Sequence, residues 1–200
     1  MLILSLDTAS PFPSLAIGGG GGPERTRSLP PGAAESLPVA LAALLADAGR
    51  TVRDLGRVAA LSGPGSFTGV RAGLAFARGL ARGRGIPLVL VPTFAAAHEA
   101  RPEPAGTVFV LDAGRGDMHA ALSTGGGVAD AMPPRPRPEV ESDAAARGRS
   151  VVDLGVEDVQ LAAAAGRIAA RHEAGSHGVV YGRPSAAEEK RARLEALEST

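Results

Sequence analysis

The sequence predicts an α/β protein made of two related halves, and three observations support this fold class. Short apolar runs typical of buried strands alternate with segments in which apolar residues recur at helical spacing. Each half opens with a strand that ends in Asp, Leu2–Asp7 (LILSLD) and Thr107–Asp112 (TVFVLD). A second strand follows each of them, Ser14–Ile17 in the first half and Met118–Leu122 in the second. This repeated order suggests an internal duplication, but strand–Asp–turn also occurs in α/β proteins without one, and the spacing alone leaves both interpretations open.

The elements of the first half follow from turn residues and periodicity. The glycine tract Gly18–Gly22 should be the turn of a hairpin that returns along Glu24–Leu29. A helix is expected over Glu35–Ala48, with Ser36 as its N-cap. The remaining elements are a strand at Val58–Leu61, a long helix at Phe67–Arg84, a strand at Ile86–Val91 and a short helix at Thr93–Ala100.

The second half should begin near the Pro-containing stretch Arg101–Gly106. This divides the chain into an N-terminal lobe at residues 1–103 and a smaller C-terminal lobe at residues 104–200. The Pro- and Arg-rich segment Pro133–Pro138 predicts a loop. The other expected elements are a third strand at Val128–Met132, a strand at Val151–Leu154, a helix at Asp158–Ala174 and a charged terminal helix at Ala186–Leu197.

Composition excludes several classes of protein. The chain has 200 residues, of which 44% are hydrophobic, so it can bury a substantial core and is too apolar for a disordered protein. It has no apolar run of about 20 residues, and the N-terminal MLILSLDTAS lacks a basic segment, so neither a membrane-spanning helix nor a signal peptide is expected. Without Cys there is no disulfide, thiolate nucleophile or Cys-based zinc site. These features favour a cytoplasmic protein.

The charge balance argues against unaided nucleic-acid binding. Lys and Arg total 21, Asp and Glu also total 21, and aromatic residues make up 3% of the chain. A protein that binds RNA or DNA by itself usually has a basic excess, and often aromatic side chains on which bases stack. A stand-alone RNA-binding module is therefore disfavoured.

The most specific segment is Gly63–Arg71 (GPGSFTGVR), which lies between a predicted strand and the long helix. Its glycines allow a tight turn, and Ser66 or Thr68 can cap the helix. It is neither a Walker A loop nor a dinucleotide-binding fingerprint, because its spacing differs from both. The favoured interpretation is a strand–turn–helix connection that needs glycine for its geometry. The alternative is an anion site at the helix N-terminus.

The long helix carries a stripe of small residues. Gly69, Gly73 and Ala77 are spaced four apart beside Val70 and Leu74. Such a stripe lets another helix approach closely. The alternative is that it packs within the chain, against the sheet of the same lobe. Arginines at positions 71, 78 and 82 restrict burial to part of the helix circumference.

Several segments together are similar to one known family. They are Leu6–Ser10 (LDTAS), Glu35–Gly49 (ESLPVALAALLADAG), Gly63–Ala81 (GPGSFTGVRAGLAFARGLA), Leu111–Leu122 (LDAGRGDMHAAL) and Tyr181–Lys190 (YGRPSAAEEK). These segments resemble the TsaB (YeaZ) family, the bacterial accessory proteins of tRNA threonylcarbamoyladenosine biosynthesis. The resemblance is close in the first half of the chain and looser in the second.

This resemblance implies an actin/hexokinase-like (ribonuclease H-like) fold of two lobes, each a mixed sheet with flanking helices. It also implies a non-catalytic scaffold or activator. The related TsaD-like subunit would transfer the threonylcarbamoyl group, a TsaE-like ATPase would join the assembly, and tRNA would be contacted only indirectly. The first two helices of the N-terminal lobe would bind the TsaD-like subunit, or a second copy of the chain through the same surface. The implied interface residues are Leu37, Leu41, Gly69, Val70, Gly73, Leu74 and Ala77.

Candidate ligands for a metal or a nucleotide are few. TsaD-like enzymes hold a metal through a His pair spaced HxxxH, and the four histidines here offer no such pair. They are His98, His119, His172 and His177. Asp7 and Asp112 follow the opening strands, where actin-like ATPases bind phosphate, so they could hold Mg²⁺ through waters at a weak or vestigial nucleotide site. The favoured interpretation is that both carboxylates cap turns. No catalytic residue, resident metal or cofactor is expected.

Two alternative functions remain. An actin-like ATPase or small kinase would use Asp7 or Asp112 as a base or metal ligand, and Asp7→Asn should abolish its ATP turnover. A metallopeptidase, which older names of the family suggest, has no HExxH motif, no Cys and no Ser-His-Asp arrangement in its favour.

Overall fold

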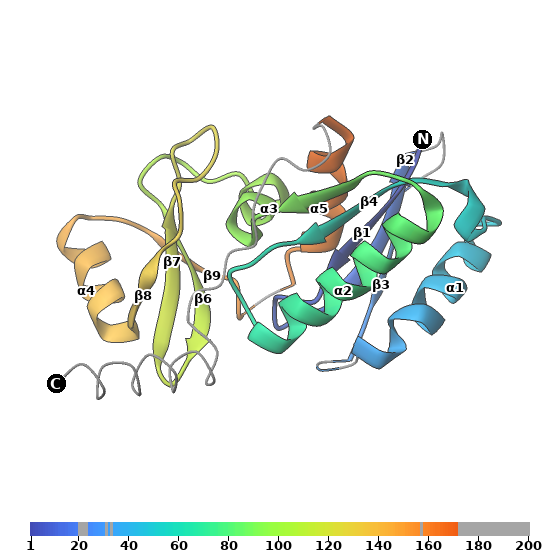
Figure 1. The fold of residues 1–200 in the computed structure, drawn as a ribbon. Helices are drawn as coiled ribbons and strands as arrows, with labels where there is room; N and C mark the ends of the chain where they lie inside the picture. The colour runs from blue at the N-terminus through green and yellow to red at the C-terminus, as the bar shows by residue number, and fades with distance from the viewer. Residues whose placement is uncertain (20–23, 31, 33, 157, 172–200) are drawn as a thin grey trace, which may run out of the picture.

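The computed structural model describes residues 1–19, 24–30, 32, 34–156 and 158–171. It contains two mixed β-sheets, and helices pack on each of them (Figure 1). No helix within the described ranges is both long and apolar enough to cross a membrane.

The first sheet has five strands in the order β3-β2-β1-β4-β5. β1 (Leu2–Asp7), β2 (Ser14–Gly19) and β3 (Arg25–Ser28) form an antiparallel meander. β4 (Leu55–Leu61) pairs in parallel with β1, and β5 (Leu88–Val91) pairs in parallel with β4. Every residue of β1 is buried, as expected for a central strand covered on both faces. The carboxyl ends of the three parallel strands therefore share one edge of the sheet.

Helices cover both faces of the first sheet. α1 (Leu37–Asp47) and α2 (Phe67–Arg84) lie on one face, and α5 (Leu161–Arg171) lies on the other, against β1, β2 and β4 (Figure 1). α3 (Thr93–Ala100) packs against α5. Two short 3-10 helices, η1 (Ala34–Ser36) and η2 (Val52–Asp54), precede α1 and β4.

The second sheet has four strands in the order β8-β7-β6-β9. They are β6 (Val108–Gly114), β7 (Asp117–Leu122), β8 (Met132–Pro136) and β9 (Val151–Asp153), and α4 (Arg137–Ala146) packs against β7 and β8. Side chains of β6 alternate between the two faces. Val108 and Val110 pack in a small cluster with Val140 of α4, whereas Phe109 and Leu111 join the core of the first sheet. One face of the second sheet therefore shares a core with the first sheet, and its other face forms a separate small cluster with α4.

The structure corrects the prediction for the segment Pro133–Pro138. It is not a loop, because Met132–Pro136 forms the edge strand β8 and α4 begins directly after it. Proline is tolerated there because an edge strand forms ladder hydrogen bonds on one side only. The third strand of the second half thus begins at Met132, while Val128 forms only an isolated bridge with Ser123. The sequence analysis also missed helix α4.

Helix α5 lies on the first sheet, although its sequence position falls within residues 104–200. Its inner face consists of small residues that allow a close approach to the sheet. Ala162 and Ala163 pack on Ala16 of β2, and a Cβ atom at Gly166 would come within 2.9 Å of the Ser5 hydroxyl. The division of the chain into lobes after residue 103 stays a prediction. The expected helix at residues 186–197 lies outside the described residues.

Candidate functional site at the β1 turn and the α1/α2 surface

The turn after β1 is organised by the buried carboxylate of Asp7. Its Oδ1 accepts hydrogen bonds from the backbone N–H groups of Ala9 (2.9 Å) and Ser10 (3.0 Å). The Ser10 hydroxyl donates to Oδ2 at 2.5 Å. Burial raises the pKa of Asp7 to about 6, although the hydrogen bonds from Ser10 and Ala9 oppose this rise. Asp7 therefore caps this turn, in agreement with the favoured interpretation.

The GPGSFTG loop lies directly on the same turn. The Ser66 N–H donates to the Ala9 carbonyl at 2.8 Å, and the Thr8 hydroxyl donates to the Gly69 carbonyl at 2.7 Å. A Cβ atom at Gly65 would overlap the Ala9 carbonyl, and one at Gly69 would overlap the Thr8 carbonyl. Glycine is therefore required at both positions because two backbone segments touch.

Two backbone N–H groups at the start of α2 have partners within the chain. Ser66 is the N-cap, and its hydroxyl accepts the N–H of Gly69 at 3.2 Å. The N–H of Ser66 is itself used in the contact with the β1 turn. These contacts support the interpretation of the loop as a strand–turn–helix connection. None of the contacts in the described part of the chain points to an anion site.

The small-residue stripe of α2 packs inside the chain. A Cβ atom at Gly73 would overlap the Thr8 hydroxyl, and the side chain of Ala77, one turn further along α2, is fully buried. The structure therefore favours the alternative in which the stripe meets its own sheet. The side chains predicted for the partner interface also point inward, since Leu37, Leu41, Val70 and Leu74 are all buried in the core. A partner that binds these helices has to contact their outer faces instead.

The second candidate carboxylate, Asp112, lies near the end of β6. It is exposed, and its Oδ1 accepts the N–H of Gly114 at 3.1 Å. The charged neighbour of Asp7 is instead Asp158, which precedes α5 and adds to the rise in the pKa of Asp7. Each of the two predicted carboxylates thus caps its own turn. Within the described ranges no three His, Asp or Glu side chains are grouped to hold a metal, and the weak nucleotide site stays a prediction.

Two of the histidines lie on elements at the contact between the sheets. The ring of His98 on α3 meets the ring of Phe109 on β6 edge-on, with 6.2 Å between the ring centroids. His119 on β7 is 3% exposed, and burial lowers the pKa of its imidazole. Both residues are packing residues in this arrangement. His172 and His177 lie outside the described residues.

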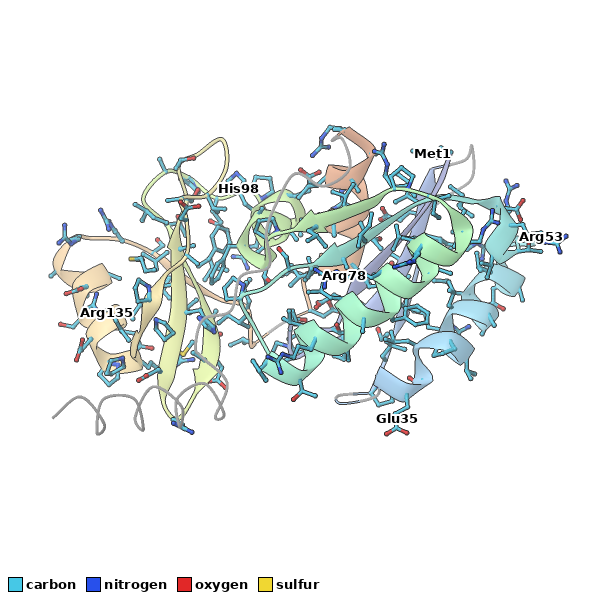
Figure 2. The ribbon with its side chains drawn as sticks, in the orientation of Figure 1. Met1, Glu35, Arg53, Arg78, His98 and Arg135 are labelled. Carbon is cyan, nitrogen blue, oxygen red and sulfur yellow. The ribbon has the colours of Figure 1, made fainter. Side chains whose placement is uncertain are left out.

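The outer faces of α1 and α2 form an exposed surface. The sequence analysis placed the partner surface on these two helices but named inward-facing residues for it. We call it the α1/α2 surface, and it consists of Pro38, Val39, Ala42 and Ala46 of α1 with Arg71, Ala75, Arg78 and Arg82 of α2. Val39 is 72% exposed. The one charged residue of α1 is Asp47, which pairs with Arg27 at 2.6 Å. Figure 2 labels Arg78 on α2, on the same face of the sheet as α1.

The composition of α1 is the signal that could have revealed this surface. The segment LPVALAALLAD contains a single charged residue, so both the inner and the outer face of the helix are apolar. A helix that is apolar all round is normally covered on all sides. Among the described residues, the sheet covers one side of α1 and no segment covers the side that carries Val39.

Two mixed sheets that share a core on one face of the second, with helices on both faces of the first, define a two-lobed actin-like (ribonuclease H-like) α/β protein. This is the fold class that the sequence predicts. The family model described as "TsaD: tRNA N6-adenosine threonylcarbamoyltransferase" matches residues 30–133, just over half of the chain. The chain therefore belongs to this threonylcarbamoyltransferase family.

Individual relatives agree with this assignment. A tRNA N6-adenosine threonylcarbamoyltransferase from Maricaulis maris (strain MCS10) is 48% identical over 58 residues, which are 29% of this chain and 15% of that protein. The chain thus matches only a small part of the length of this curated relative. The match therefore supports membership of the family, and the activity of the full-length relative is not transferred to this chain.

Solved structures share the fold. YeaZ from Pseudomonas aeruginosa gives a TM-score of 0.57 at 24% identity, covering 66% of this chain and 65% of that one. A further structure, of an uncharacterized protein with similarity to peptidase YEAZ from Pseudomonas aeruginosa, gives a TM-score of 0.66 at 20% identity, covering 91% and 99%. The resemblance to YeaZ proteins that the sequence motifs indicate is thus confirmed at the level of the fold.

Proposed function

We propose that this chain is a non-catalytic subunit that binds and activates the TsaD-type subunit in tRNA N6-threonylcarbamoyladenosine modification. Membership of the TsaD family and the fold shared with YeaZ support a role in this modification. The observation that carries the proposal is the exposed apolar face of α1, where Val39 is 72% exposed. Such a face gains free energy when a partner covers it.

The arrangement of the Asp7 turn supports a non-catalytic role. A catalytic carboxylate has to reach a substrate, whereas both oxygens of Asp7 already accept hydrogen bonds from the turn that they cap. In this proposal the TsaD-type partner supplies the transferase site and the contact with tRNA, and a TsaE-type ATPase joins the complex. The chain itself needs no cofactor and works in the cytoplasm. A second copy of the chain would compete for the same α1/α2 surface.

Reconstitution of threonylcarbamoyl transfer to tRNA tests the proposal. The reaction contains the TsaD-type subunit, the TsaE-type ATPase and chemically supplied threonylcarbamoyl-adenylate, with and without this chain. We expect modification to depend on the chain, and the chain alone to hydrolyse no ATP. Modification that proceeds equally well without the chain contradicts the proposal. ATP hydrolysis by the chain alone, lost in Asp7→Asn, would instead support an actin-like ATPase or small kinase.

A matched pair of variants tests the surface. Val39→Asp places a charge in the apolar face of α1, and we expect it to weaken binding of the TsaD-type subunit by on the order of a hundredfold. Val156→Asp is the control, because Val156 is 76% exposed and lies outside the α1/α2 surface. Both changes leave the core intact, so the circular dichroism spectrum of each variant should match that of the wild type. Equal binding by the two variants would contradict the assignment of the surface.

A further inference from the structure

Strand β3 forms an open edge of the first sheet. It is the outermost strand in the order β3-β2-β1-β4-β5 and, among the described residues, pairs with β2 alone. Its four residues include no proline, and three of them are exposed. The outermost strand of the second sheet, β8, differs because three of its five residues are prolines, which have no N–H to offer to a further strand. The edge of β3 is therefore suited to the addition of a strand.

The register of β3 shows which backbone groups face this edge. Leu29 directly follows the strand, and its N–H donates to the carbonyl of the residue before β2 at 2.8 Å. In an antiparallel pair, residues that exchange hydrogen bonds alternate with residues that do not. Arg25 and Arg27 therefore bond to β2, whereas the N–H and C=O groups of Thr26 and Ser28 point to the open edge. The described part of the chain places no hydrogen-bond partner against them.

The side chains of β3 are divided between the two faces of the sheet. Thr26 lies opposite Ala16, which packs on α5. Arg25 and Arg27 lie on the other face, beside α1 (Figure 1). Here β3 and α1 enclose a hollow of about 440 Å³, lined by Arg25, Thr26, Arg27, Leu44 and Asp47. A side chain of an added strand can enter this hollow.

The hollow carries an unbalanced positive charge. Asp47 pairs with Arg27 at 2.6 Å, and no other carboxylate in the described ranges forms an ion pair with either arginine. Two guanidinium groups thus face one carboxylate. Nη2 of Arg27 makes this pair, while its Nε has no hydrogen-bond partner among the described residues. A second carboxylate, brought in by an added strand, would balance the charge of the hollow.

A second copy of the chain is a poor occupant of this edge. In a symmetric pair each copy contributes the same strand, so Arg25 and Arg27 would face the same arginines of the other copy. Like charges directly opposite each other in a sheet oppose pairing, whereas opposite charges stabilise it. The arginines therefore disfavour self-pairing at an exposed edge and favour a strand with acidic side chains.

We infer that the open edge of β3 binds an extended acidic segment of a partner protein as an additional strand. The outward N–H and C=O groups of Thr26 and Ser28 pair with the backbone of the segment, the mode in which a peptide extends a sheet. Asp or Glu side chains at every second position lie opposite Arg25 and Arg27 and enter the hollow. The edge of β3 lies outside the α1/α2 surface, so the inference does not depend on the proposed function.

Two short capped peptides test the inference with the full chain at about 50 mM NaCl, where surface charges are weakly screened. Glu alternates with Thr in one peptide, and Lys alternates with Thr in the other. We expect the Glu peptide to bind at least about tenfold more tightly than the Lys peptide. Bound Glu peptide should also slow hydrogen exchange at the N–H groups of Thr26 and Ser28, measured by NMR. No binding of the Glu peptide at up to about 1 mM overturns the inference.

Variants separate the backbone contacts from the charges. Thr26→Pro removes an outward N–H that the pairing with β2 does not use, so the chain should fold and bind the Glu peptide on the order of tenfold more weakly. Arg25→Glu should reverse the preference, so that the Lys peptide binds more tightly than the Glu peptide. Arg147→Glu makes the same charge change at an exposed site beside α4 and should alter neither affinity by more than about twofold.

The outcomes distinguish strand addition from simple charge attraction. If Thr26→Pro binds the Glu peptide as well as the wild type does, and the peptide leaves the exchange of Thr26 and Ser28 unchanged in the wild type, the arginines hold a free anion and no strand is added. If Thr26→Pro fails to fold, hydrogen exchange in the wild type decides by itself. An unchanged preference in Arg25→Glu would contradict the selection of acidic segments. None of these results bears on the reconstitution that tests the proposed function.

Discussion

Asp7 shows how burial changes the chemistry of a single side chain. Its pKa rises from 3.8 to about 6, first because the carboxylate is desolvated and despite the hydrogen bonds from Ser10 and Ala9. The folded protein therefore holds this proton more tightly than the unfolded chain. The contribution of protonated Asp7 to the free energy of unfolding is fully present below about pH 4 and is lost as the pH rises through about 6. Over that whole range the loss for this one group is about 3 kcal/mol.

We predict that Asp7→Asn removes this part of the pH dependence of stability. Asn keeps an oxygen that can accept the N–H groups of Ala9 and Ser10, and it carries no titrating proton. Between about pH 4.5 and 7.5 the wild type should lose roughly 2 kcal/mol more free energy of unfolding than the variant does. Urea unfolding followed by circular dichroism at the two pH values measures the difference. Asp112→Asn makes the same chemical change at an exposed turn and serves as the control.

Two glycines of α2 allow a matched comparison on one helix. Gly69→Ala places a methyl group into the Thr8 carbonyl, so we predict a loss of about 2–3 kcal/mol in the free energy of unfolding. Nothing lies within 4 Å of a Cβ atom at Gly79, where alanine should stabilise the helix by up to about 1 kcal/mol. Urea unfolding of both variants tests the pair. Equal stabilities would mean that the stripe does not pack against the β1 turn.

At the scale of elements, the start of α2 depends on its cap. The Ser66 hydroxyl accepts the N–H of Gly69, one of the N–H groups at the helix start that have no partner within the helix. We predict that Ser66→Ala lowers the free energy of unfolding by about 1 kcal/mol. Thr68→Ala is the control in the same turn, since alanine is the better helix former at that exposed position. A Ser66→Ala variant as stable as the wild type would contradict the role of the cap.

Helix α5 lies at the end of the described chain and packs against strands from its beginning. It packs on β1 and β2, and its arginines reach two other elements. Arg167 pairs with Glu24, which directly precedes β3, at 3.2 Å, and Arg171 pairs with Glu99 of α3 at 2.5 Å. These pairs are partly exposed and contribute little to stability by themselves. The close contact made by the alanines and Gly166 of α5 is what fixes the helix on the sheet.

At the scale of the whole molecule, the shared core couples the two sheets. Phe109 of β6 is completely buried, belongs to the same apolar cluster as the first sheet and contacts His98 of α3. We therefore predict that both sheets unfold in one transition. Phe109→Ala should lower the free energy of that transition by about 3–5 kcal/mol. Urea unfolding followed by hydrogen exchange of β4 and β7 amides tests this. Two transitions, with only the second sheet affected by the substitution, would contradict the prediction.

The sequence by itself determined the fold class, the order of most elements and the family. The strand β1 is buried on both faces, so its run of apolar residues was readable. Helix α2 was readable from its helical periodicity and its candidate caps Ser66 and Thr68, of which the structure selects Ser66. Local signals failed at Met132–Pro136, because proline in a strand is tolerated only at a sheet edge, and the edge is set by the other strands. The packing of α5 on the first sheet was unreadable for the same reason, since it depends on contacts distant in sequence.

Only the tertiary structure decided which face of each helix is available. Gly69 and Gly73 look equally suited to a partner helix or to a sheet, because spacing shows which residues share a face and not what covers that face. The structure places Thr8 against both glycines, which turns the stripe inward. The outer faces are then left to Val39 of α1 and the arginines of α2. Burial is a property of the whole fold, so the proposed partner surface could be identified only from the packing of the two helices on the first sheet.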